Sequence, residues 1–161
     1  MSNATAPPPR PAAPGQSIET LNLVKEIEID APQDVVFESI LEEITTGSTG
    51  EKGLPMAMKL EAWPGGRWYR DLGDNTGHFW GHVQVIKPPK LLELCGPMFM
   101  SYPVASHVQY RLTPGNGRTL LKLTHRAVGL IDPEHARGVN EGWGHVIENI
   151  ARIAKRRAAA K

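Results

Sequence analysis

Two side chains in the C-terminal half of the chain, His125 and Tyr110, are of types that can bind a polar atom or transfer a proton. His125 lies in an alternating segment with Leu121 and Leu123, so a strand there would turn its imidazole toward the same interior as the two leucines. A neutral imidazole in an apolar pocket can bind a ligand oxygen or move a proton. The sequence favours the alternative, a buried structural histidine that bonds to backbone or to a tyrosine.

Tyr110 belongs to a second alternating segment, in phase with Val108 and Leu112. Its hydroxyl would then reach the same interior as His125, where it could donate or accept a hydrogen bond. A purely structural tyrosine fits the pattern equally well. His107 has the opposite phase, so we expect it to face water and assign it no function.

The remaining histidines and the single cysteine do not predict a metal site. His78 and His82 are four residues apart, a spacing that a strand stretches to about 13 Å, and no third ligand accompanies them. Cys95 has no neighbouring base in the sequence, so we interpret it as a packing thiol. Spacing supports neither a Ser-His-Asp grouping nor a phosphate-binding glycine loop. We therefore expect no metal and no cofactor, and a catalytic residue is not assigned.

Composition describes one globular domain with no strong electrostatic field. The chain has 161 residues, 40% of them hydrophobic, and a formal net charge of +1, which argues against nucleic acid as a partner. A single cysteine excludes an internal disulfide and is typical of the cytoplasm. No apolar run reaches the roughly 20 residues of a membrane span. Residues 1–17 are rich in proline, so we predict a disordered tail before a domain at 18–157.

The domain must position these side chains on strands and helices that hydrophobic periodicity makes visible. An alternating strand at 21–29 is followed by a helix that Pro32 opens at its first position and that ends near Gly47. A glycine-rich loop at 47–55 could act as a gate. Turn signals then separate six further predicted strands: 58–62, 67–72, 77–86, 91–95, 104–112 and 119–127.

A long amphipathic helix closes the chain. Asp132 and Pro133 form its start, and Trp143 lies on its apolar face. Gly142 and Gly144 weaken this helix, which indicates a close approach to the sheet or a widened pocket. Because no other long helix is available to cover the sheet, the final helix must lie across one curved antiparallel face. The predicted fold class is α+β, with space between sheet and helix.

Four sequence strings resemble one family in order and spacing. They are IDAPQDVVF at 29–37, PGGRW at 64–68, VQVIKPPKLL at 83–92 and EGW at 141–143. They are similar to the START-like (SRPBCC) superfamily, in its branch named for activators of the heat-shock-protein ATPase. The resemblance covers about 18–157 and implies a helix-grip fold, a curved sheet wrapped around a long C-terminal helix.

This resemblance implies that a small hydrophobic or aromatic molecule, such as a lipid or a polyketide-like compound, binds between sheet and helix. Trp68 and Trp143 occupy positions that commonly line the family's cavity, where they would stack on a ligand or fill the space. With Tyr110 and His125 they are our candidate ligand-binding residues. Val83 and Val85 would face inward by the same resemblance, leaving Trp80 outside for a homodimer contact or for pairing with a neighbouring aromatic ring.

Two other functions remain open. The superfamily includes polyketide cyclases and dehydratases, in which His125 or Tyr110 would move a proton, so whether the protein is an enzyme is undecided. The family name also suggests a chaperone ATPase-associated module that binds a protein. We rank this role lowest, because the chaperone activators carry an additional N-terminal domain where this sequence has a short proline-rich segment.

Overall fold

The computed structural model describes residues 13, 16–50 and 52–161. The described residues form seven strands and two helices, in the predicted order. These are β1 (Glu19–Ile29), α1 (Gln33–Glu43), β2 (Met58–Leu60), β3 (Arg67–Gly73), β4 (Thr76–Lys87), β5 (Leu91–Gly96), β6 (Val104–Gly115), β7 (Arg118–Gly129) and α2 (Pro133–Ala159). The predicted tail at 1–17 lies almost entirely outside the described residues, so it and the domain boundary at 18 stay predictions.

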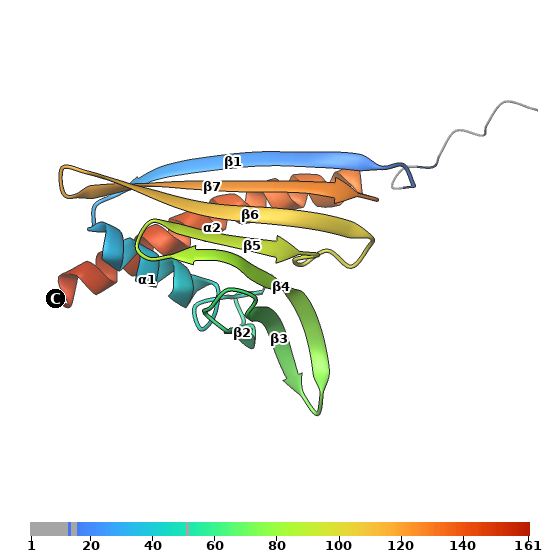
Figure 1. Cartoon of the computed structure of the whole chain (residues 1–161), viewed down its shortest axis with the longest axis horizontal. Helices are drawn as coiled ribbons and strands as arrows, with labels where there is room; N and C mark the ends of the chain where they lie inside the picture. Colours follow the sequence, from blue (N-terminus) through green and yellow to red (C-terminus); the bar gives the residue numbers. More distant parts are fainter. Residues whose placement is uncertain (1–12, 14–15, 51) are drawn as a thin grey trace, which may run out of the picture.

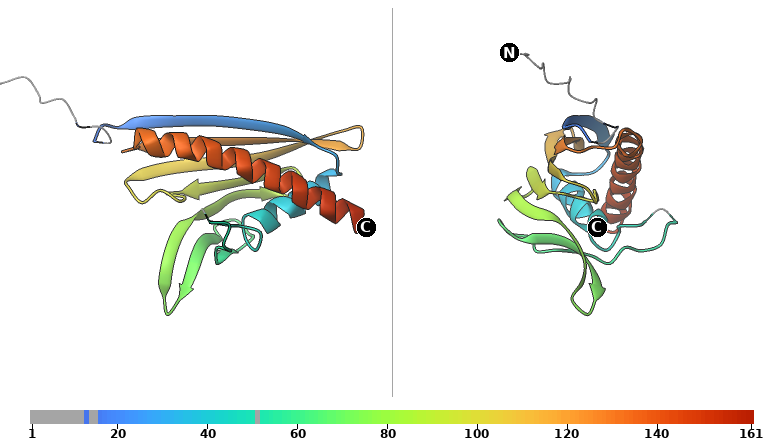
Figure 2. Two further views of the ribbon diagram at one scale, coloured as in Figure 1. Left: turned by 180° about the vertical axis from the view of Figure 1, so that it is seen from behind. Right: turned by 90° about the vertical axis from the view of Figure 1, so that its right-hand side faces the viewer.

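All seven strands belong to one antiparallel sheet in the order β1-β7-β6-β5-β4-β3-β2. The N-terminal strand β1 forms one edge, beside the last strand β7, and the hairpin of β3 and β4 bends away from the rest of the sheet (Figure 1). Helix α2 runs across one face of this curved sheet, with α1 near its C-terminal end (Figure 2). The α+β helix-grip prediction is confirmed.

Helix α1 starts one residue later and ends earlier than the sequence predicted. Pro32 is the residue before the helix, with extended backbone angles, and not the first helical residue. Its carbonyl accepts the first helical hydrogen bond, from the amide of Val36. The helix ends at Glu43, where Ile44 caps it and the indole of Trp68 donates to the Ile44 carbonyl at 2.9 Å. A side chain from β3 thus satisfies an acceptor at the helix end.

Helix α2 begins as predicted. The Asp132 carboxylate accepts from the backbone amides of Glu134, at 2.8 Å, and His135, at 3.3 Å, which satisfies two donors that the helix itself cannot pair. Its buried side chains fall on one stripe: Val139, Trp143, Ile147, Ile150, Ile153 and Ala154. In the described ranges, neither helix is long and apolar enough to cross a membrane.

A bulge in β4 places Trp80 on the opposite side from the one expected. Trp68 lies opposite Gly81, but the next residue of β3, Tyr69, lies opposite Phe79. Trp80 is therefore an extra residue in its strand, and the alternation shifts there. Its ring packs edge-on against Trp68, with centroids 4.9 Å apart. The prediction that Trp80 lies outside was wrong, whereas its pairing with a neighbouring aromatic ring is observed.

A second register shift in β4 turns Val85 away from the core. Val83 is opposite the buried Leu94, but Val85 is opposite Glu93 on the outer face. Ile86 takes the inward position and packs against the core. The expectation that both valines face inward was therefore half right, because the extra residue between them changes the phase of the strand.

Candidate functional site

A cavity of about 730 Å³ lies between the concave face of the sheet and α2. The closest backbone approaches of α2 are to β1 and to α1, so the helix leans on one side of the sheet. The cavity opens on the other side, under β3, β4 and β6, and residues 48–50 border it. Its size falls within the range of roughly 300–1,000 Å³ that is usual for small-molecule sites.

Aromatic rings form most of one wall. Trp80 contacts both Trp68 and Phe99 edge-on, and Phe99 lies 6.0 Å from the ring of Trp143. Tyr110 is 6.3 Å from Trp143 on the other side. We call Trp68, Trp80, Phe99 and Trp143 the aromatic wall. All four line the cavity, as does Tyr110, so the structure brings three of the four predicted site residues together around one space.

Glycines form the facing surface of α2. Gly138 and Gly142 both line the cavity, one helical turn apart. A methyl group built on either would meet no atom within 4 Å. Gly142 therefore does not allow a close approach to the sheet; its missing side chain leaves the cavity wide. Gly144 also faces open space, but it is not among the lining residues.

His125, the fourth predicted site residue, lies behind Trp143. Its Nδ1 accepts a hydrogen bond from the Trp143 indole at 2.9 Å, and its Nε2 lies 3.0 Å from the Ser106 hydroxyl. Because an indole can only donate, Nδ1 carries no proton and Nε2 donates to Ser106. Burial lowers the pKa of His125 to about 4, helped by the nearby charge of His107. The imidazole is neutral at pH 7, with both nitrogens occupied.

Polar groups gather at the end of the cavity where α1 meets α2. The Tyr110 hydroxyl is fully buried and has no hydrogen-bond partner within the described residues. Glu43, at the end of α1, and Asn149, on α2, line the same region, and Asn149 offsets part of the effect of burial on the pKa of Glu43. Burial raises the pKa of Glu43 from 4.5 to about 7. Burial, and then the charge of Glu43, raises the pKa of Tyr110.

Sequence reasoning missed Glu43. It follows Val36 and Ile40 on the buried face of α1 and is itself only 7% exposed. A carboxylate in phase with an apolar helical stripe was the available signal, because an acidic residue is rarely buried without a partner.

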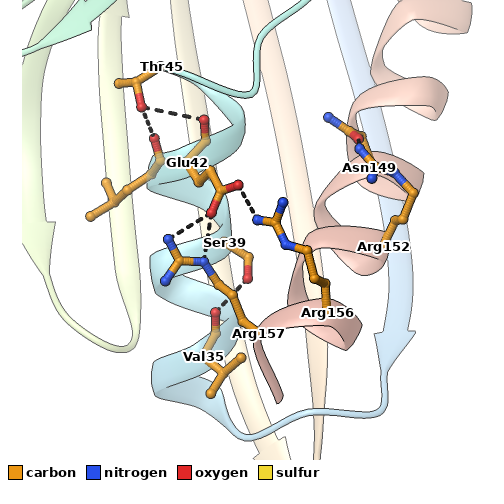
Figure 3. Close-up of polar contacts among 9 residues, drawn as sticks. Val35, Ser39, Glu42, Thr45, Asn149, Arg152, Arg156 and Arg157 are labelled. Atoms are coloured by element: carbon orange, nitrogen blue, oxygen red, sulfur yellow. Dashed lines mark hydrogen bonds and ion pairs between the residues drawn. The ribbon is translucent and has the colours of Figure 1, made fainter. Parts of the chain in front are cut away.

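The neighbouring residue, Glu42, fastens the two helices together (Figure 3). It pairs with Arg156 and, at 2.7 Å, with Arg157, both near the end of α2. Hydrogen bonds from Arg156 and then Arg157 lower the pKa of Glu42 despite partial burial. This pair of contacts holds the last turn of α1 against α2, and so fixes where Glu43 sits.

The cavity is bordered by two connecting segments. Tyr102, before β6, contacts His135 of α2 through its hydroxyl at 2.6 Å from Nδ1. On the other side, Ser48 and Gly50 lie in the segment 47–55, where backbone bonds join Gly50 to Leu54 and Met56 to Ser48. The predicted gate thus borders the cavity, and its opening stays a prediction.

Two ion pairs join charged residues of the β2–β3 region, whereas the buried Nε of Arg70 has no hydrogen-bond partner among the described residues. Arg67 binds both carboxylate oxygens of Glu61, at 2.8 and 2.7 Å, and Lys59 binds Asp71 at 2.6 Å. These are exposed surface pairs and none lines the cavity. No group of three His, Cys, Asp or Glu side chains in the described part of the chain is arranged to hold a metal ion.

Comparison with known protein families finds one family that matches most of this chain. The family described as Activator of Hsp90 ATPase homolog 1-like protein matches residues 30–155. The chain belongs to this family. It is thus a member of the START-like superfamily, as the helix-grip fold also shows. No curated protein sequence matches this family member significantly.

Solved structures share the fold of this activator-homologue chain at low sequence identity. CalU16 from Micromonospora echinospora is 20% identical, with a TM-score of 0.58 over 90% of this chain and 96% of that one. Ara h 8.0201 is 11% identical, with a TM-score of 0.63 over 86% and 99% of the two chains. DynU16, from the dynemicin biosynthetic locus, is 16% identical, with a TM-score of 0.59 over 84% of this chain and 47% of that chain.

Proposed function

We propose that this protein binds one small, mostly apolar molecule with an aromatic or alicyclic body in the cavity between sheet and α2. The observation that carries the proposal is the cavity itself, about 730 Å³ between the sheet and α2. A site of this kind combines apolar walls with a few polar groups that orient the ligand. The aromatic wall and the Glu43 end supply these two features.

In this proposal Trp68, Tyr110 and Trp143 contact the ligand directly. His125 acts through Trp143, because its Nδ1 fixes the orientation of the indole. The segment 47–55 opens and closes the cavity. A lipid or polyketide-like compound fits the ligand class, and a cytoplasmic location fits the single cysteine.

The solved structures support the fold, and this fold provides the cavity between the sheet and α2. DynU16 is a protein of the dynemicin biosynthetic locus, and a place in a biosynthetic locus is compatible with a protein that binds a ligand. Identities of 11–20% carry the argument no further.

A cyclase or dehydratase is our second candidate, and Glu43 is the observation that favours it. A carboxyl group with a pKa of about 7 can both accept and release a proton near neutral pH. His125 is less suited, because both its nitrogens are engaged. Tyr110, with its raised pKa, is suited to hydrogen bonding and not to proton loss. A role at a chaperone ATPase would be supported by a pulldown that recovers such an ATPase and stimulates its turnover.

Binding is tested with N-phenyl-1-naphthylamine, an uncharged probe whose fluorescence rises in apolar surroundings. We expect saturable one-site binding to the wild-type protein. Gly142→Leu fills the cavity from α2 and should abolish binding, whereas Gly144→Leu makes the same change outside the cavity and should leave binding intact. Absence of saturable binding to the wild type, or equal binding by Gly142→Leu, would contradict the proposal.

A further inference from the structure

The charged residues of the cavity are acidic. Among the described residues that line it, Glu43 and Glu141 are carboxylates, His135 and His145 are imidazoles, and none is a lysine or arginine. The guanidinium groups of Arg156 and Arg157 do not line the cavity and are held by Glu42 (Figure 3). An anionic ligand therefore finds no fixed positive charge in this space.

The Glu43 carboxyl has no positively charged partner among the described residues. Asn149 is the one hydrogen-bonding group that acts on its pKa, and burial outweighs it. A buried carboxylate is costly unless it is paired. A ligand that brings a positive charge would remove this cost, whereas a ligand carboxylate or phosphate would add to it.

The Tyr110 hydroxyl is a second polar group without a partner in the described part of the chain, and it borders the same cavity. It is fully buried and is close enough to Glu43 for the carboxylate to raise its pKa. A buried hydroxyl normally has a partner. A primary ammonium group has three donors, so one such group can serve both the carboxylate and the tyrosine oxygen.

The aromatic wall also favours a ligand with a positive charge. Ring faces attract cations, and the attraction is stronger where water is excluded. Tryptophan is the best of the aromatic residues for this interaction, and three of the four rings of the wall are tryptophans. Apolar walls of this kind would also bind a neutral ligand, so they support the choice of a cation only together with Glu43.

We propose that the cavity is specific for an aromatic or alicyclic amine, whose ammonium group lies between the Glu43 carboxylate and the Tyr110 hydroxyl. The apolar body of the amine then lies along the aromatic wall. This inference rests on the proposed ligand-binding function and names its ligand class: cations are preferred, neutral alcohols of the same shape bind more weakly, and acids are rejected.

The test uses three probes that differ in one group. They are 1-naphthylmethylamine, 1-naphthalenemethanol and 1-naphthoic acid, each competing with N-phenyl-1-naphthylamine at about pH 8, where the Glu43 carboxyl, with a pKa of about 7, is ionised. Charge-assisted hydrogen bonds are roughly twice as strong as neutral ones, so we expect the amine to bind about tenfold more tightly than the alcohol. The acid should compete least.

Two variants test whether the Glu43 carboxylate causes the preference for the amine over the alcohol. Glu43→Gln keeps the side-chain shape and should bring the amine down to the affinity of the alcohol, with alcohol binding unchanged. Glu38→Gln removes a charge from an exposed position of the same helix, outside the cavity, and should leave the preference intact. A preference that survives Glu43→Gln would overturn the assignment.

The wild-type protein alone can also refute it. If the alcohol or the acid competes as well as the amine while N-phenyl-1-naphthylamine binds, the proposed amine specificity is wrong. The proposed binding of a small molecule in the cavity then still stands. If N-phenyl-1-naphthylamine itself does not bind, the proposed function fails first.

Discussion

The burial of Glu43 makes stability depend on pH in a direction opposite to that of most carboxylates. Its pKa in the folded protein, about 7, is above the reference value of 4.5. Between these values the folded state binds more protons than the unfolded chain, so the free energy of unfolding falls as pH rises. At about 1.4 kcal/mol for each pH unit, the total loss is about 3 kcal/mol. Below about pH 4.5 both states are protonated and the cost disappears.

Replacement of Glu43 by glutamine isolates this effect. Urea unfolding is measured from about pH 4.5 to about pH 8 for the wild type and for Glu43→Gln, and the two free energies of unfolding are subtracted at each pH. Groups common to both proteins, His125 included, cancel in the difference. We expect the wild type to lose about 3 kcal/mol relative to Glu43→Gln across this range, with most of the change below about pH 7.

The neighbouring carboxylate provides a control of opposite sign. Hydrogen bonds from Arg156 lower the pKa of Glu42, so its stabilising contribution is present at neutral pH and is lost as pH falls through the lowered pKa. The difference between wild type and Glu42→Gln should therefore not decline between about pH 4.5 and about pH 7. A flat difference for Glu43→Gln over the same range would refute the assignment of a buried, unpaired carboxyl.

Three further substitutions test separate parts of the site. Gly142→Ala should raise stability by up to about 1 kcal/mol, measured by urea unfolding, because a methyl group there meets no atom and alanine favours the helix; a loss of stability would show that the space is filled. Trp143→Phe should lower stability by about 1–3 kcal/mol and weaken probe binding, because it leaves the Nδ1 of His125 without its donor; unchanged thermal unfolding would contradict this. Asp132→Ala should cost about 1 kcal/mol through loss of the helix cap, while Glu134→Ala, which keeps the cap, should cost less.

Strand phase and helix position were predictable because they depend on local pattern. Alternation placed Tyr110 and His125 on the inner face, and both are fully buried there. The hydrogen-bond partners of His125 were not predictable, since Trp143 and Ser106 come from other elements. We expected backbone or a tyrosine as the partner. The side chains meet only once the sheet and α2 have assembled.

The wrong or missing predictions share one physical cause. At each of these places a single residue interrupts the alternation of a strand or the apolar stripe of a helix. Trp80 is an extra residue in its strand, and the adjacent Gly81 was the available signal, because glycine inside a strand often marks a bulge. Glu43 was overlooked for the related reason that a single acidic residue at a helix end is usually solvated. Its burial depends on α2 lying against α1, which no short segment of sequence encodes.

The pairing of β1 with β7 sets the order in which this chain can mature on the ribosome. Strands β3 to β7 are joined by short hairpins and can associate as they emerge, but the edge of β7 that receives β1 forms only when residues near 118–129 are synthesised. Until then β1 has no neighbouring strand in the sheet. Translational stalling before β7 would therefore leave β1 unpaired and prone to aggregation.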